Sequence, residues 1–119
     1  MGEGMDVRID SSRAGGATVV KVVGEVDVFT APQLREALAV ATEGDGRQVV
    51  VDLEDVDFLD STGLGVLVFG LKRVRERGGD LSVVCRHEQI LKVLTITGLS
   101  KILKVHASVD EAVPAANQV

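Results

Sequence analysis

A serine and a threonine, Ser61 and Thr62, follow an aspartate in the stretch "DVDFLDSTGLGVLVFG" and stand just before an apolar helical pattern. Backbone N–H groups in the first turn of a helix have no partner within the helix, so a side-chain oxygen at this position commonly caps it. A hydroxyl at the same place can also be phosphorylated, and a helix N-terminus accommodates the added negative charge. The spacing therefore leaves two interpretations of Ser61 open: a helix cap, or a site of phosphorylation.

Other groups that could carry chemistry are scattered. His87 and His106 fall on different predicted elements and have no cysteine partner pattern, so we expect no metal site. Cys85 ends a valine-rich strand, which favours a buried and unreactive thiol. The sequence contains no Gly-Lys-Ser/Thr phosphate loop, and "STGLGV" lacks the third glycine of a dinucleotide site. We therefore expect no cofactor.

Asp52 raises a rival hypothesis, because it ends a buried strand as the phospho-accepting aspartate of a response-regulator receiver would. Two features count against this hypothesis. The chain begins with two strands, whereas a receiver passes from its first strand into a helix. The last predicted strand also lacks a lysine at its end, since Val105 and His106 follow Lys104.

The elements that must position these groups begin with a strand, in which Met5, Val7 and Ile9 alternate with charged residues. "SSRAGGA" predicts a turn, and "TVVKVVGEV" predicts a second, antiparallel strand. A helix should follow, with Thr30 and Gln33 as a capping box and Phe29 and Leu34 as a hydrophobic staple across it. Gly44 and Gly46 should end this helix.

Strands and helices alternate over the rest of the chain. "RQVVVDL" predicts a buried strand, "DVDFLD" a connection, and Ser61 the N-cap of a second helix that ends at Gly78 and Gly79. Next come a strand "DLSVVC", a helix "HEQILKVLTITG" and a strand "KILKVHA". A short helix follows, which a capping box starts and which Pro114 should cut short or kink. The order β-β-α-β-α-β-α-β-α predicts an α/β fold with a mixed, mostly parallel sheet and helices packed against it.

Bulk properties limit the class of protein. The chain has 119 residues, 45% of them hydrophobic, which predicts a single domain with a core of its own. A net charge of −5 argues against binding nucleic acid or an anionic membrane surface. The start of the chain has no apolar signal region, and the longest apolar run is too short to span a bilayer. We expect a cytoplasmic protein that is a monomer or a weak dimer.

Two stretches resemble the STAS domain family. They are "GEVDVFTAPQL" and, further along the chain, "VDLEDVDFLDSTGLGVLV"; the closing stretch "ITGLSKILKVHASVDEAV" is also similar to the family's last segment. More narrowly, the chain looks like the bacterial anti-sigma factor antagonists. The resemblance covers residues 5–113 as a STAS domain and leaves residues 114–119 as a frayed tail.

The resemblance implies a protein-interaction switch and no enzyme. In such proteins the unphosphorylated form binds an anti-sigma factor that is itself a serine kinase, and thereby releases the sigma factor. Phosphorylation, expected here on Ser61 with Thr62 as a minor alternative, ends the binding, and a phosphatase resets it. The residues expected to shape the partner-binding surface are Asp27, Thr30, Asp60, Ser61, Thr62, Gly63, Leu64 and Gly65. Glu54, Asp55 and Asp57, with Asp60, should make this corner acidic.

Two further functions stay open. Some STAS domains have been proposed to bind nucleotides or other small ligands, although this chain has no phosphate loop and no tyrosine or tryptophan for stacking. A scaffold role in a large stressosome-type assembly is the other. Titration with a nucleotide would test the first, and size-exclusion chromatography the second.

Overall fold

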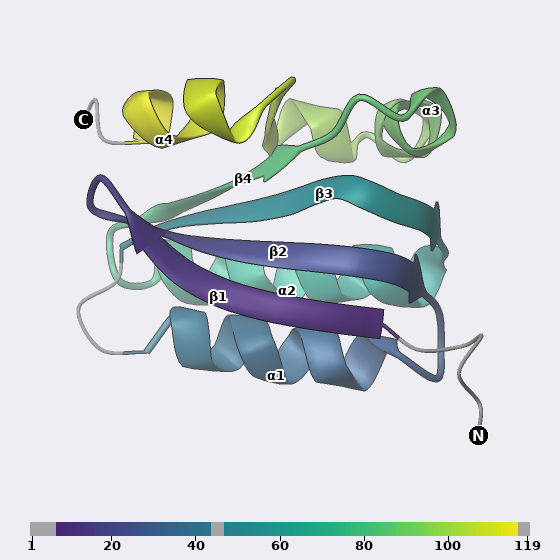
Figure 1. Cartoon of the computed structure of the whole chain (residues 1–119), viewed down its shortest axis with the longest axis horizontal. Helices are drawn as coiled ribbons and strands as arrows, with labels where there is room; N and C mark the ends of the chain where they lie inside the picture. Colours follow the sequence, from purple (N-terminus) through teal and green to yellow (C-terminus); the bar gives the residue numbers. More distant parts are fainter. Residues whose placement is uncertain (1–6, 44–46, 117–119) are drawn as a thin grey trace.

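Five strands lie side by side in the order in which the chain forms them, and helices cover both faces of the sheet (Figure 1). The computed structural model describes residues 7–43 and 47–116. In chain order the elements are β1 (Val7–Ala14), β2 (Ala17–Val26), α1 (Ala31–Ala41), β3 (Gln48–Leu59), α2 (Ser61–Arg75), β4 (Asp80–Val84), α3 (Glu88–Ile96), the 3-10 helix η2 (Leu99–Lys101), β5 (Lys104–His106) and α4 (Val109–Ala116). The predicted α/β class and element order are confirmed.

The sheet is mixed, with one antiparallel pair. β1 is antiparallel to β2, and β2, β3, β4 and β5 are parallel to one another. The turn between β1 and β2 consists of Gly15 and Gly16, both with positive φ, a conformation that favours glycine. The predicted turn "SSRAGGA" is therefore too long, because residues 11–14 pair with β2 up to the Ala14–Ala17 pair.

The hydrophobic core has two parts, one on each side of the sheet. α1 and α2 pack side by side on one face, where Leu34, Leu38, Leu67 and Leu71 are buried (Figure 1). α4 covers the other face, where Ala112 joins a smaller buried cluster. The consecutive valines at the start of β3 are shared between the two: Val49 and Val51 face α1 and α2, and Val50 faces α4. This arrangement explains why that stretch shows no polar alternation.

Two strand lengths and one helix differ from the sequence-based predictions. β3 continues through the predicted connection "DVDFLD" to Leu59, because this stretch pairs with β2 across two register shifts. β5 begins only at Lys104, since the preceding residues form η2 and a turn. Pro114 lies inside α4, which continues to Ala116, so proline does not cut this helix short, and the alternative, a kink at Pro114, stays a prediction. Met5 and the predicted helix stop at Gly44 and Gly46 fall outside the described residues.

Candidate functional site

The two stretches that carry the sequence resemblance meet at one corner of the molecule. β2 and β3 are parallel and end side by side, with Val26 paired to Leu59. The backbone N–H of Asp60 donates to the carbonyl oxygen of Val26 at 3.2 Å, which ties the two strand ends together. From here β2 leads into α1 and β3 leads into α2, so the connections before both helices form one surface.

Asp60, and not Ser61, caps α2. One carboxylate oxygen of Asp60, Oδ1, accepts hydrogen bonds from the N–H groups of Thr62 at 2.9 Å and Gly63 at 3.1 Å. The extended backbone of Asp60 is the conformation that an N-cap residue takes. Ser61 is instead the first residue of the helix and is exposed to solvent. The prediction of Ser61 as the cap is wrong, and its hydroxyl remains accessible at the helix N-terminus.

Asp27 organises the turn between β2 and α1. Its Oδ1 accepts hydrogen bonds from the N–H groups of Phe29 at 2.9 Å and Thr30 at 3.0 Å. Desolvation alone would raise the pKa of Asp27, but the hydrogen bonds from Thr30 and Phe29 stabilise the charged form and lower the pKa below its ordinary value. Asp27 thus shapes this surface from within the turn.

Thr30 also belongs to this turn and is 3% exposed. Its hydroxyl donates to the carbonyl oxygen of Glu25 at 2.7 Å and accepts from the N–H of Asp27 at 2.9 Å. Thr30 makes no side-chain capping bond to α1, so the predicted capping box with Gln33 is wrong. The competing hydrogen bonds within the turn explain this, because the hydroxyl is already engaged on the strand side.

The turn leaves two apolar side chains on the surface. Phe29 is 75% exposed and Val28 is 59% exposed. The predicted staple between Phe29 and Leu34 is therefore wrong, because Leu34 is fully buried and Phe29 points away from the core. Sequence reasoning missed this apolar surface, although two consecutive large apolar residues in a connection between elements could have signalled it.

A shallow depression of about 380 Å³ separates the first turns of α1 and α2. Val28, Pro32 and Arg35 line one side of it, and Thr62 and Gly65 line the other. The Arg35 guanidinium lies 3.9 Å from the centre of the Phe69 ring, a cation–π contact. The depression is thus mainly apolar with one cation at its rim.

Gly63 and Gly65, both in the stretch "VDLEDVDFLDSTGLGVLV", have different surroundings. Gly63 is buried, and a Cβ atom there would lie 2.5 Å from Leu59 Cδ1 and 2.8 Å from Val26 Cγ1. Close packing of α2 on the sheet therefore explains Gly63. Gly65 is exposed, and a Cβ atom there would meet nothing within 4 Å.

The eight residues predicted for the partner surface all lie at this corner, but at different depths. Ser61, Thr62 and Gly65 are exposed, and Asp27 and Asp60 are half-buried. Thr30, Gly63 and Leu64 are buried, so they support the surface from below.

Several carboxylates near this corner have partners. Asp55 forms an ion pair with Lys21 at 3.0 Å, and Glu54 forms one with Arg86 at 3.3 Å. The hydrogen bond from Lys21 to Asp55, with the charge of Asp52 nearby, raises the pKa of Lys21. Asp60 is engaged in capping, whereas Asp57 is exposed. The corner is therefore less negative than its composition suggests.

Asp52 does not occupy the position that a receiver phospho-acceptor would need. It lies inside β3 and is 3% exposed, and its Oδ2 is 3.5 Å from the Nζ of Lys21. Asp52 Oδ1 accepts the N–H of Glu54 at 3.0 Å, so the carboxylate is held within the strand. The receiver hypothesis is also overturned by the comparisons below.

Within residues 7–43 and 47–116, no group of three or more His, Cys, Asp or Glu side chains could hold a metal ion. The same residues include no helix that is long and apolar enough to cross a membrane. Cys85 is buried, and burial raises the pKa of its thiol, as expected for an unreactive cysteine.

Comparisons with known proteins agree with the fold. The family model of the STAS domain matches residues 8–112. The anti-sigma-B factor antagonist of Bacillus subtilis (strain 168) is 36% identical over 109 residues, which cover 92% of this chain and 99% of that relative. A crystal structure of an anti-sigma factor antagonist from Mycobacterium paratuberculosis has a TM-score of 0.88 at 29% identity and covers 95% of this chain and 96% of its own.

The Bacillus cell fate determinant SpoIIAA in its phosphorylated form shares the fold, with a TM-score of 0.71 at 20% identity, over 91% of this chain and 98% of that one. The chain belongs to the STAS domain family. Its curated relatives are named anti-sigma-B factor antagonists, and similar solved structures are anti-sigma factor antagonists.

Proposed function

We propose that this protein is an anti-sigma factor antagonist that phosphorylation of Ser61 switches off. The unphosphorylated form binds an anti-sigma factor with serine kinase activity and so releases the sigma factor in the cytoplasm. A phosphatase restores the binding form. Relatives that match nearly the whole chain are named anti-sigma-B factor antagonists, which supports the antagonist role.

The observation that carries the proposal is the accessible hydroxyl of Ser61 at the first residue of α2. Because Asp60 supplies the cap, modifying Ser61 leaves both capping hydrogen bonds in place. The helix dipole at this end favours an added anion. Phosphorylation of Ser61 by a kinase should therefore not destabilise the helix.

The surroundings of Ser61 explain why phosphorylation would end binding. A partner would cover and desolvate one surface, which consists of the exposed apolar side chains of Val28 and Phe29 and the depression beside them. A phosphate group of charge about −1.5 to −2 at its edge would have to lose water on binding. A penalty of about 2.7 kcal/mol lowers affinity a hundredfold, so the switch requires no change of conformation.

The test measures binding of the anti-sigma factor to matched variants. Ser61→Ala should bind as tightly as the unphosphorylated protein and resist phosphorylation. Ser61→Glu should bind about tenfold to a hundredfold more weakly. Thr62→Ala is the control for the acceptor residue: it should still be phosphorylated on Ser61, as mass spectrometry after incubation with ATP, Mg²⁺ and a lysate of the native host would show. Equal affinity of Ser61→Ala and Ser61→Glu, or phosphate on Thr62 alone, would contradict the proposal.

A further inference from the structure

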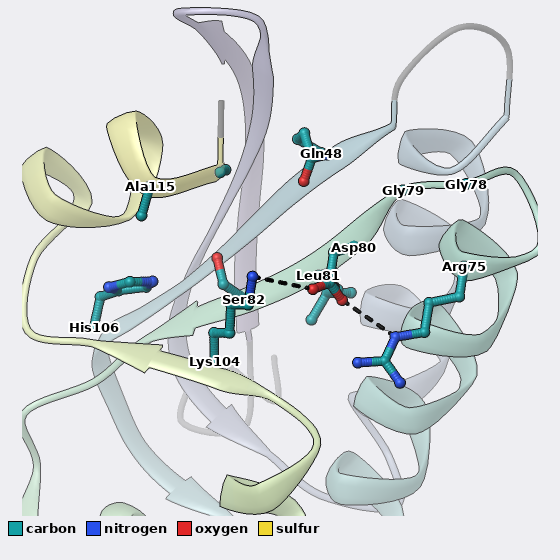
Figure 2. Close-up of a pocket in the computed structure, with 11 residues that line it drawn as sticks. Gln48, Arg75, Gly78, Gly79, Asp80, Leu81, Ser82, Lys104, His106 and Ala115 are labelled. Atoms are coloured by element: carbon teal, nitrogen blue, oxygen red, sulfur yellow. Dashed lines mark hydrogen bonds and ion pairs between the residues drawn. The ribbon is translucent and has the colours of Figure 1, made fainter. Parts of the chain in front are cut away.

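A second cavity, of about 210 Å³, lies at the opposite end of β3 from Ser61 (Figure 2). It opens where β3 and β4 begin and where α2 and α4 end, so the 15-residue helix α2 separates it from Ser61 by about 22 Å. Its polar lining residues are Gln48, Arg75, Asp80, Ser82, Lys104 and His106. None of them belongs to the stretches that carry the sequence resemblance at the Ser61 corner.

Ser82 forms part of the wall of this cavity and is unusual for a residue in the middle of a buried strand. It is 6% exposed, and its Oγ has no hydrogen-bond partner among the described residues. A buried hydroxyl without a partner is unfavourable, because it has given up its hydrogen bonds to water. Figure 2 shows the Ser82 hydroxyl on the side of β4 where Ala115 of α4 and His106 of β5 lie. The Oγ atom is closed off from solvent in this conformation, so a ligand in the cavity would reach it after the Ser82 side chain turns to another staggered rotamer.

The charges around Ser82 favour an anion. Asp80 is paired with Arg75 at 3.3 Å and with Lys104 at 3.6 Å, so two cations share one carboxylate. Arg75 is held further by a hydrogen bond of 3.0 Å to the carbonyl oxygen of Ile102. Lys104 is paired in register with Ser82 on the neighbouring strand, so the two side chains leave the sheet on the same face. The cavity therefore has an excess of one positive charge, in a chain whose net charge is −5.

We propose that this cavity binds a small oxyanion, a carboxylate or phosphate group, with the Ser82 hydroxyl and the Lys104 ammonium as donors. The imidazole of His106 and the amide of Gln48 are further hydrogen-bonding groups of the lining. The volume is below the 300–1,000 Å³ or so that pockets for larger ligands occupy, which favours a small metabolite over a nucleotide. This proposal does not depend on phosphorylation of Ser61.

The test is an NMR titration of the full chain with inorganic phosphate and, separately, with acetate. Sodium chloride at matched ionic strength serves as the reference for screening. We expect saturable shifts of the backbone amides of Gly79, Ser82 and Lys104. The arm that saturates identifies the group: phosphate only, acetate only, or both for an oxyanion site of low selectivity. Ser82→Ala should raise the Kd about tenfold, because a hydrogen bond to a charged group is lost.

Two lysine variants provide a second, independent measurement. Lys104 is 68% exposed, so Lys104→Gln should fold normally and bind the anion about tenfold more weakly. Lys101→Gln, in η2 outside the cavity lining, should leave the Kd unchanged. The proposal is overturned if neither anion gives saturable shifts, which would mean that water alone satisfies Ser82. It is also overturned if Lys104→Gln and Lys101→Gln bind equally.

Discussion

At the scale of single residues, a shift of one position separates the helix cap from the accessible hydroxyl. Asp60 takes the cap, and Ser61 begins the helix on the surface. The sequence suggested Ser61 as the cap, because serine and aspartate are almost equally good caps and the pattern does not distinguish adjacent positions. The assignment matters because a serine that capped the helix would lose its hydrogen bond when phosphorylated. Here the capping hydrogen bonds belong to a different residue.

Gly63 and Gly65 are two residues apart in the same helix, but the space around their Cα atoms differs. Gly63 faces the sheet and lets α2 approach Val26 and Leu59. Gly65 faces solvent beside the shallow depression. The sequence analysis placed both glycines on the partner-binding surface, whereas close packing against the sheet explains Gly63. Partner approach at Gly65 stays a prediction.

Alanine substitutions at these two glycines should change stability in opposite directions. Gly63→Ala places a methyl group in contact with Leu59 and Val26, and overpacking should lower the free energy of unfolding by about 1–2 kcal/mol after the gain in helix propensity. Gly65→Ala meets no neighbour and should raise it by about 0.5–1 kcal/mol. Urea unfolding monitored by circular dichroism measures both. Equal effects of the two substitutions would show that packing against the sheet does not require glycine at position 63.

At the scale of elements, hydrogen bonds of the turn between β2 and α1 decide how the site is presented. Asp27 and Thr30 use their side chains inside the turn, so α1 starts without a side-chain cap. The same turn holds Phe29 and Val28 outside the core. The sequence predicted a capping box and a staple at this place, because both motifs fit the spacing. The hydrogen bonds to the end of β2 prevail, since they are available only once strand and helix are packed.

The Asp27 turn predicts a dependence of stability on pH. The pKa of Asp27 is lowered in the folded chain, so on acidification the unfolded chain takes up this proton first. The stabilisation is complete above the ordinary pKa, about 4, and is lost as the pH falls through the lower folded value. Asp27→Asn keeps an oxygen that can accept the same hydrogen bonds but does not titrate.

The stability of the wild type relative to Asp27→Asn should therefore decline between pH 6 and pH 3. Urea unfolding at both pH values measures this difference, and a ¹³C titration of the Asp27 carboxyl group reports its pKa directly. A difference between the two proteins that is the same at both pH values would contradict the role of the charged carboxylate in the turn.

At the scale of the whole molecule, the parallel pairing of β2 and β3 creates the site. Their ends are adjacent, so two stretches that are distant in sequence form one surface at one corner. The same topology places the starts of β3 and β4 at the other end, where the cavity around Ser82 opens. α2 spans the distance between the two, with Ser61 at its first residue and Arg75 at its last.

Phosphorylation of Ser61 should leave the fold unchanged. The phosphate would lie at a helix N-terminus, where an anion stabilises the helix. This should raise the free energy of unfolding by only about 0.3–1 kcal/mol. SpoIIAA, which is 20% identical to this chain, has the same fold in its phosphorylated form. Circular dichroism spectra of both forms should coincide, and their melting temperatures should differ by a few degrees at most. A large loss of helix on phosphorylation would mean that the switch works by unfolding and not at the partner surface.

The sequence by itself determined the α/β class and the order of the elements. These follow from local information: the period of apolar residues, and the residue types that begin and end helices. The candidate phosphorylation site rests instead on the resemblance of two stretches to the STAS domain family. The tertiary structure decided which of two adjacent residues caps α2, how far β3 extends, that α4 continues past Pro114, and that Ser82 is buried in a charged cavity. Each of these depends on hydrogen bonds or packing between different segments of the chain. A local sequence pattern does not predict such contacts.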